Sequence, residues 1–222
     1  MSTDDRLTPL DVRRRLLDQA ARVLAEEGAA ALSVRRLVKA VSTSTMAVYT
    51  HFGSMPGLVR ALMTEGFDRF HERVARAAAA HPDDPVAELA ALCRAYQDFA
   101  HDEPDVYAVM FGGSAFAGFA LTEEDRRLGI HVLRPPRDAI RRCLTAGRFR
   151  AGGEPDLLVR QLFCQMHGLA QLGRAGYIAG SFGPREVLHG MVLDFVRAAG
   201  DHPDAAETSV AAGLGTGAAA TD

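Results

Sequence analysis

The feature that most constrains the fold is a pair of short helical segments separated by a tight polar turn. Ser33 precedes the first segment and Ser44 precedes the second, and serine at such positions accepts hydrogen bonds from the free amides of a helix start. Only Ser42 and Thr43 lie between the end of the first segment and the second serine. Helices of about two turns are unstable alone in water, because nucleation is costly. Both segments must therefore pack on longer neighbours, as in a helix-turn-helix.

The rest of the chain also shows helical periodicity, and strand patterns are nearly absent. Gly, Pro and Asp residues separate the helical stretches. The sequence therefore predicts an all-α protein of about nine helices. The expected helices cover about 9–27, 34–40, 45–51, 55–80, 85–100, 104–111, 122–146 with an interruption at Pro135-Pro136, 156–177 and 184–199.

Charge is distributed unevenly along the chain, whose formal net charge is −3. Residues 1–80 contain twelve Lys and Arg against nine Asp and Glu, whereas the remainder contains thirteen against nineteen. Between Ser33 and Phe52 there is no acidic residue. A basic, acid-free patch suits phosphate binding, which releases condensed counterions. A solvated basic face is the alternative that charge alone leaves open.

The second short helix has one face that packing leaves free. Val48 and Phe52, four residues apart, are its expected inner positions. The opposite face carries hydroxyl, methyl and aromatic groups, which can enter a DNA major groove and meet phosphates, base edges and thymine methyls. Tyr49 could instead be a core residue. The predicted DNA contacts are Ser33, Arg35, Arg36, Ser44, Thr45, Met46, Ala47, Tyr49, Thr50 and His51.

Residues 16–63 resemble the N-terminal domain of TetR-type transcriptional regulators. The resemblance rests on the run Ala-Arg-Val-Leu-Ala-Glu-Glu-Gly ending at Gly28, on Ser33-Val-Arg-Arg-Leu-Val, and on Tyr49-Thr-His-Phe after a Ser-capped helix start. It implies that the second short helix reads an operator and that Tyr49 and His51 contact phosphates or base edges. It also implies a dimeric regulator, usually a repressor.

Three places depart from the usual pattern of that family. Ser42 stands where the turn usually has Gly, which adopts a left-handed backbone at no cost. Thr45 and Met46 stand where the recognition helix usually has Lys and Gly, and Met55 replaces a Lys. The missing positive charges favour weaker nonspecific DNA affinity, or compensation by arginines of the first and fourth helices.

The C-terminal part is rich in aromatic and sulfur-containing side chains, most of which are expected only to pack in a core. Others could line an apolar cavity between helices, as in small-molecule sites of helical bundles. His167, in a run that resembles the Trp-x-x-x-His-Gly motif of one TetR subgroup, could orient a ligand or be a core histidine. Little cationic charge converges there, so the expected ligand is largely apolar. The predicted ligand contacts are Tyr96, Phe99, Met110, Phe111, Phe116, Phe119, Phe163, Met166 and His167, with the Gly-rich loop 112–121 as a lid.

The last two predicted helices carry more apolar surface than one core needs. Pairing of these helices with the same surfaces of a second copy would form a four-helix bundle around a two-fold axis. Two recognition helices related by that axis would match a palindromic operator. The predicted dimer contacts are Leu172, Leu188, Met191, Val192 and Phe195.

Other classes of protein fit the sequence less well. No Gly-x-Ser-x-Gly, P-loop, Rossmann or His-Glu-x-x-His motif is present, so an enzyme is not expected. Cys93, Cys143 and Cys164 are an odd number at no metal-ligand spacing, and neither a metal nor a cofactor is expected. The alternative that stays open is a helical small-molecule-binding protein with weakened or lost DNA binding.

The predicted organisation has two domains and two tails. Residues 8–54 form the helix-turn-helix DNA-binding domain, and residues 55–199 form the effector-binding and dimerisation domain. Residues 1–7 and 200–222 are expected to be disordered, because they offer little apolar bulk. The N-terminus is polar and acidic, and no apolar stretch has the length of a membrane span. The expected partners are operator DNA, a second copy and a small-molecule effector, in the cytoplasm and without a membrane.

Overall fold

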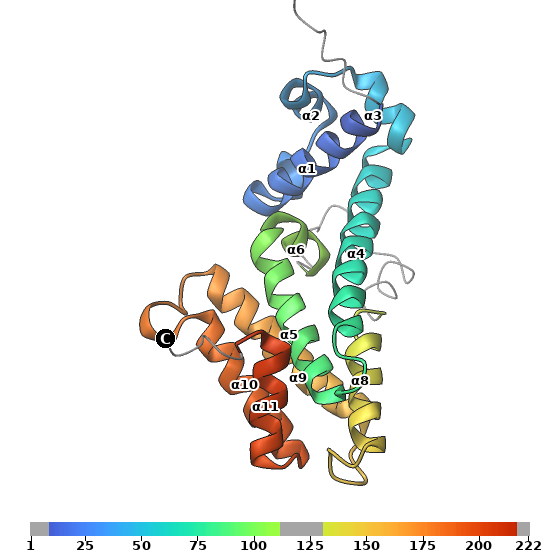
Figure 1. The fold of residues 1–222 in the computed structure, drawn as a ribbon. Coiled ribbons are helices and arrows are strands. Elements are labelled where there is room, and N and C mark those ends of the chain that lie inside the picture. Colours follow the sequence, from blue (N-terminus) through green and yellow to red (C-terminus); the bar gives the residue numbers. More distant parts are fainter. Residues whose placement is uncertain (1–8, 112–130, 217–222) are drawn as a thin grey trace, which may run out of the picture. The chain divides into compact units, whose positions relative to one another are not determined.

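A computed structural model describes residues 9–111 and 131–216, and Figure 1 shows its fold. These two ranges contain ten α-helices and no strand, which confirms the all-α class. None of the helices in them is both long and apolar enough to cross a membrane. Several predicted features lie outside the described residues: the tail 1–7, the helix beginning at Thr122, and the loop 112–121 with Phe116 and Phe119.

The chain forms two compact units, each made of two stretches of sequence. Of the described residues, the first unit comprises 9–69 and 103–111, and the second comprises 70–102 and 131–216. The first division falls inside the long helix α4 (Met55–Ala79), so this helix contributes to both units. The compact units therefore do not follow the boundary at residue 54 that the sequence suggested.

The first unit is organised around its N-terminal helix, which contacts the other helices of the unit. The buried face of this helix includes Leu16, Leu17 and Ala20, none of which is exposed to solvent. Gly28, with φ 79°, ends it as predicted, because glycine adopts a positive φ without strain. The elements of the first unit are α1 (Pro9–Glu27), the 3₁₀ turn η1 (Ala29–Ala31), α2 (Val34–Val41), α3 (Thr45–Phe52), α4 up to Arg69, and α6 (Pro104–Phe111).

Serine side chains begin α2 and α3, as the sequence predicted. The Oγ of Ser33 accepts a hydrogen bond from the amide of Arg36 at 3.4 Å, and the Oγ of Ser44 accepts one from the amide of Ala47 at 3.3 Å. Val48 is fully buried at the centre of α3. The helix-turn-helix thus has capped starts and a shared core, which keep two short helices folded.

The second unit surrounds a central helix that is buried along most of its length. Asp84 begins that helix by accepting hydrogen bonds from the amides of Val86 and Ala87 at 3.0 and 3.1 Å. Helices of the second unit contact it on several sides. The elements of the second unit are the remainder of α4, α5 (Pro85–Asp102), α8 (Arg134–Thr145), α9 (Pro155–Arg174), the 3₁₀ turn η3 (Gly180–Phe182), α10 (Pro184–Ala199) and α11 (Pro203–Leu214).

The helical interruption predicted at Pro135-Pro136 lies a few residues earlier in the structure. Pro135 and Pro136 lie inside the first turn of α8, and the non-helical residues are Val132 and Leu133 just before it. Proline suits this position because the first amides of a helix have no partner within the helix, and its fixed φ is already helical.

The prediction of disorder across residues 200–222 is wrong for residues 200–216, the described part of that segment. Pro203–Leu214 form α11, which packs along α5 and buries Ala206 and Val210 completely. A Cβ atom added to Gly213 would lie 2.2 Å from the carbonyl oxygen of Ala87. The small side chains therefore allow two helix backbones to approach closely, and their low bulk did not signal disorder.

Candidate DNA interface and effector pocket

The outer face of α3 is available to a partner. Met46 and Tyr49 expose 70% and 52% of their surface, and Thr45 and Thr50 are also exposed. Val48 on the opposite side is 0% exposed. Tyr49 is therefore a surface residue and not a core residue, so the aromatic ring predicted to contact DNA is accessible.

Most of the other predicted DNA contacts are at least partly accessible. Ser33, Arg35, Arg36 and Ser44 are exposed, whereas Ala47 and His51 are half-buried. Phe52, the predicted inner residue at the end of α3, is also only half-buried. The accessible surface thus combines hydroxyls, methyls, an aromatic ring and basic groups, and no acidic residue of the segment interrupts it.

An acidic residue from outside the segment reaches one of these basic groups. Glu27, the last residue of α1, forms a two-pronged ion pair with Arg36, with the Nη1 donor 2.8 Å from Oε2. The hydrogen bonds from Arg36 hold the pKa of Glu27 below its usual range, so the carboxylate is charged at neutral pH. Sequence spacing within 33–52 gave no sign of this neutralisation, because its acid precedes the segment.

The turn between α2 and α3 has a left-handed backbone at Ser42, with φ 56° and ψ 49°. It is the one non-glycine residue with positive φ in the part of the chain that the structure describes. The turn therefore keeps the geometry for which glycine is best suited, although serine occupies it.

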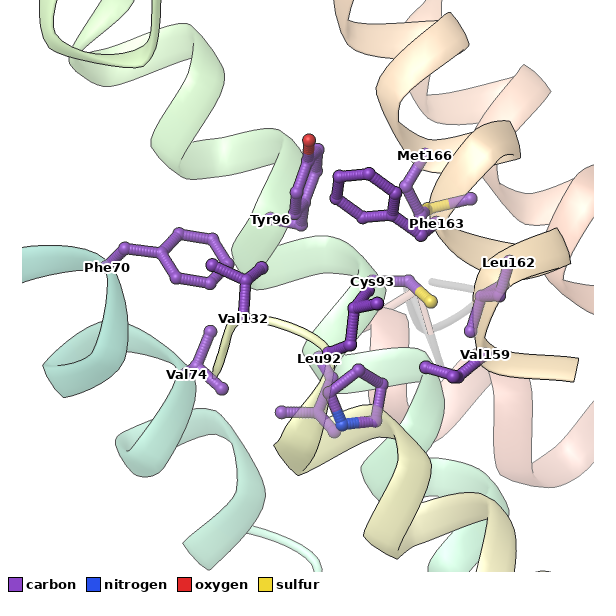
Figure 2. A pocket seen from close by; sticks show the side chains of 12 residues that line it. Phe70, Val74, Leu92, Cys93, Tyr96, Val132, Val159, Leu162, Phe163 and Met166 are labelled. Atoms are coloured by element: carbon purple, nitrogen blue, oxygen red, sulfur yellow. The ribbon is translucent and has the colours of Figure 1, made fainter. Parts of the chain in front are cut away.

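An apolar pocket lies in the second unit, and Figure 2 shows the side chains that converge on it from α4, α5 and α9. The cavity between these side chains is small, about 30 Å³, and it is partly open to solvent. None of the described residues that line it carries a carboxylate, ammonium or guanidinium group. Its residues are Phe70, Val74, Leu92, Cys93, Tyr96, Val132, Leu133, Pro136, Val159, Leu162, Phe163 and Met166.

Three of the predicted ligand contacts, Tyr96, Phe163 and Met166, line this pocket. Phe99 is fully buried behind it, edge-to-face with Phe70 at 5.3 Å. His167 does not line the pocket but lies beside Tyr96. The sequence pattern missed the aliphatic lining, because Val and Leu at helical spacing look the same in a core and in a pocket wall.

The other two described candidates, Met110 and Phe111, belong to α6 in the first unit. Met110 is buried, with its sulfur close to Gly66 of α4. The ring of Phe111 packs against Phe67 and Tyr107, with centroid distances of 6.2 and 4.9 Å. These contacts give both residues a packing role within their own unit.

A small polar group borders the pocket. The hydroxyl of Tyr96 lies 3.2 Å from Nδ1 of His167, and the amide nitrogen of Gln171 lies 3.4 Å from Nε2. The imidazole ring stacks on Phe163, with centroids 5.8 Å apart and an interplanar angle of 19°. Burial lowers the pKa of His167, so the ring is neutral at pH 7. The border therefore offers hydrogen bonds without a charge.

An open surface groove separates parts of α9 and α10. Cys164 is exposed there, and Asp194 and Ala198 face it from α10. Of the predicted dimer contacts, Leu172 is 49% exposed and Met191 is half-buried, whereas Leu188, Val192 and Phe195 are buried within the single chain. Outside the groove, Tyr177 and Phe182 expose 80% and 78% of their surface.

No cluster of metal-ligating side chains occurs among the described residues.

Two family models match the chain. The model for bacterial regulatory proteins of the tetR family matches residues 16–62, which include α2 and α3. The model for the tetracyclin repressor-like C-terminal domain matches residues 89–196. A comparison with curated proteins finds no match.

Solved structures share the fold over most of their length. A protein of unknown function from Rhodococcus sp. RHA1 is 26% identical, with a TM-score of 0.72 over 89% of this chain and 99% of that chain. The TetR family transcriptional regulator PfmR from Thermus thermophilus is 22% identical, with a TM-score of 0.68 over 82% and 97%. A tetR family regulatory protein from Rhodococcus RHA1 is 20% identical, with a TM-score of 0.67 over 86% and 98%.

The fold and the two matches define a helix-turn-helix transcription regulator with a ligand-binding C-terminal domain. The chain belongs to the TetR family of bacterial regulatory proteins. The resemblance seen in the sequence is thereby confirmed. Helix α11 lies beyond residue 196, where the C-terminal family match ends.

Proposed function

We propose that this protein is a dimeric repressor that binds a palindromic operator in the cytoplasm and leaves it when a small, uncharged, largely apolar effector enters the C-terminal domain. The observation that carries the proposal is the exposed, acid-free face of α3, with Tyr49 at its centre, in a chain that also contains an apolar pocket. The predicted DNA contacts remain the proposed interface.

The dimer is supported by an uncharged stripe on α9. Leu157, Gln161, Cys164, Leu172 and Ala175 are all exposed and lie at helical spacing along α9 and its C-terminal cap. Such spacing places them on one face of the helix. Pairing with a second copy would remove the apolar members of this stripe from water, while the exposed Arg160 beside it can keep its charge at the edge of the interface. Leu172 and Met191 are retained as proposed contacts, with Tyr177 and Phe182 added.

The class of effector follows from the pocket wall. Entry of a charged group into a wall of Val, Leu, Phe and Met side chains would lose hydration without a compensating partner. A neutral aromatic or aliphatic molecule instead gains from apolar contact.

Selection of DNA duplexes from a random pool by the full chain tests operator binding. We expect an enriched palindrome, bound by two copies of the chain. Tyr49→Ala should abolish specific binding while sedimentation shows an unchanged dimer, because more than half of the side chain is exposed and it lies in the other unit from α9. Tyr49→Phe, which removes only the hydroxyl, is the matched variant. A gel shift unchanged by Tyr49→Ala would refute the assignment.

Thermal unfolding with defined probes tests the pocket. Toluene and phenol should raise the unfolding midpoint by mass action, whereas benzoate of similar size should not. Val159→Phe should remove the shift by filling the pocket, while Ala212→Phe on the exposed side of α11 should retain it. An equal shift with benzoate would contradict the proposed effector class. A probe that stabilises the chain should also weaken its affinity for the selected operator.

A further inference from the structure

A chain of ion pairs crosses the first unit. Arg69 of α4 donates a hydrogen bond from Nη1 to Oε2 of Glu103 at 2.8 Å, and it also pairs with Glu65 one turn earlier on the same helix. The second oxygen of Glu65 accepts a hydrogen bond from Nη1 of Arg13 at 2.7 Å. The residue that precedes α6 is thus connected through α4 to α1.

The chain of contacts ends on the recognition helix. The guanidinium carbon of Arg13 lies 5.7 Å from the centre of the Phe52 ring, within the range of a cation–π interaction. Phe52 is the last residue of α3, three residues after Tyr49. Arg13 therefore contacts the C-terminal end of α3, the helix that presents Tyr49.

These ion pairs are partly sheltered from solvent, with the side chain of Arg13 the most exposed at 37%. The side chains of Arg69, Glu65 and Glu103 expose only 22%, 23% and 25% of their surface. Burial by itself would raise the pKa of Glu65, but the hydrogen bonds from Arg69 and Arg13 outweigh it and leave this pKa below its usual range. The carboxylate thus stays charged at neutral pH and holds both arginines.

Close packing joins α6 to α4 beside the ion pairs. A Cβ atom added to Gly66 would lie 2.8 Å from Cγ1 of Val106 and 2.9 Å from the sulfur of Met110. The rings of Phe67 and Phe111 meet edge-to-face at 6.2 Å. A displacement of α6 would therefore disturb both the packing and the ion pair of Arg69.

We propose that Arg13, Glu65 and Arg69 are positioning residues for operator recognition, which hold Phe52 and with it α3 in the orientation set by α6. This inference rests on the proposed operator binding, and none of the three side chains has to touch DNA. The competing role is a direct phosphate contact by Arg13, an arginine of α1 in the same unit as the helix-turn-helix.

Glu65→Gln distinguishes the two roles, because they predict opposite signs. If Glu65 positions Arg13, the variant should lose about tenfold in affinity for the selected operator and little for random duplex. If Arg13 binds phosphate, loss of the carboxylate should strengthen binding to both duplexes. The measurement is fluorescence anisotropy of the full chain with labelled duplexes of equal length at fixed salt. Operator affinity equal to or above that of the wild type overturns the proposal.

Two further variants test the connection. Arg69→Gln should also lose operator affinity, because Arg69 pairs with Glu65 and, at 3.7 Å, with Asp18 of α1. The double variant with Glu65→Gln should lose less than the sum of the two single losses, because the two side chains share one ion-pair network. Arg14→Gln is the matched control, because Arg14 is exposed and adjacent to Arg13. Its loss should lower the affinity for operator and for random duplex by the same factor or leave both unchanged. Fully additive losses for Arg69 and Glu65 would contradict a shared path.

Hydrogen exchange of the free chain gives a readout that needs no DNA. Glu65→Gln should speed amide exchange in α3 relative to the wild type and leave the second unit unchanged. Unchanged exchange in α3 overturns the proposal. A wild-type chain that selects no operator would contradict the proposed function, and exchange in α3 would still decide the positioning role.

Discussion

At the scale of single residues, the backbone strain at Ser42 is offset by the packing of the helices on either side of it. Its left-handed backbone crowds the Cβ atom of any residue other than glycine. The turn nevertheless forms, because α2 and α3 are each capped by a serine and share buried positions such as Leu37 and Val48. The packing of α2 and α3 therefore determines the backbone geometry of the turn, and Ser42 adopts that geometry at some conformational cost.

Ser42→Gly should raise the free energy of unfolding by about 1 kcal/mol, because glycine adopts the left-handed conformation without steric cost. Urea unfolding of the full chain measures the change. Ser44→Gly is the matched control, since Ser44 has φ −94° and caps α3. That variant should lower stability by a few tenths of a kcal/mol. A destabilising Ser42→Gly would show that the turn gains from its serine.

The ion pair between Glu27 and Arg36 predicts how charge limits nonspecific DNA binding. Glu27→Gln should strengthen binding to random duplex, because it frees a guanidinium for a phosphate. The slope of log affinity against log salt should steepen by about 0.9 for one added phosphate contact. Binding titrations between low and moderate salt measure both effects.

Glu26→Gln is the control for that experiment. Glu26 acts on Arg36 only through charge at a distance, so its loss changes net charge equally without releasing a hydrogen bond. It should leave the salt slope close to that of the wild type. Equal slopes for Glu26→Gln and Glu27→Gln would show that Arg36 does not reach DNA.

At the scale of elements, α11 is held by both close packing and a partly buried polar network. Arg148 donates hydrogen bonds to the two carboxylate oxygens of Asp201 at 2.7 and 2.8 Å and to Oγ of Ser209 at 3.0 Å. The hydroxyl of Ser209 donates to Oδ2 of Asp84 at 2.7 Å, at the start of α5. Polar groups that would be costly to bury alone are thus satisfied together.

Gly213→Ala should destabilise the chain by about 2 kcal/mol, although alanine favours helix, because the new Cβ meets the backbone of α5. Thermal and urea unfolding measure the loss, and hydrogen exchange should locate it in α11. Ala212→Ser, on the exposed side of the same helix, should change stability by no more than about 0.5 kcal/mol. A neutral Gly213→Ala would show that α11 does not need its close approach.

At the scale of the whole molecule, the reactivity of the three cysteine thiols provides a test of dimer formation. Burial raises the pKa of Cys93 and of Cys143 to about 12, so neither thiol is ionised at pH 8. Cys164 is exposed on the uncharged stripe of α9. In the native state only Cys164 should therefore react with a thiol reagent.

The proposed dimer predicts that this reaction slows as protein concentration rises, because pairing covers the stripe. Leu172→Arg should keep the chain monomeric in sedimentation experiments and keep Cys164 reactive at all concentrations, since a buried unpaired charge is costly. Leu10→Arg introduces the same change at an exposed leucine of α1 and should preserve the dimer. A concentration-independent rate in the wild type would contradict pairing through α9.

Much of this protein could be predicted from patterns that are short along the chain. Ser33 and Ser44 begin their helices, Gly28 ends α1, and the spacing around Val48 leaves Tyr49 exposed. Caps and helical periodicity involve residues within about four positions of one another, so they can be identified without knowledge of the tertiary structure.

The sequence by itself thus determined the all-α class, the helix-turn-helix and the family. Only the tertiary structure decided that Glu27 neutralises Arg36, that Val159 and its neighbours form a pocket wall, and that the small residues of α11 pack on α5. The reason is physical: a side chain's partner and the space around it depend on residues far away in sequence. The same residue type serves as core, pocket wall or ion pair according to what the fold brings beside it.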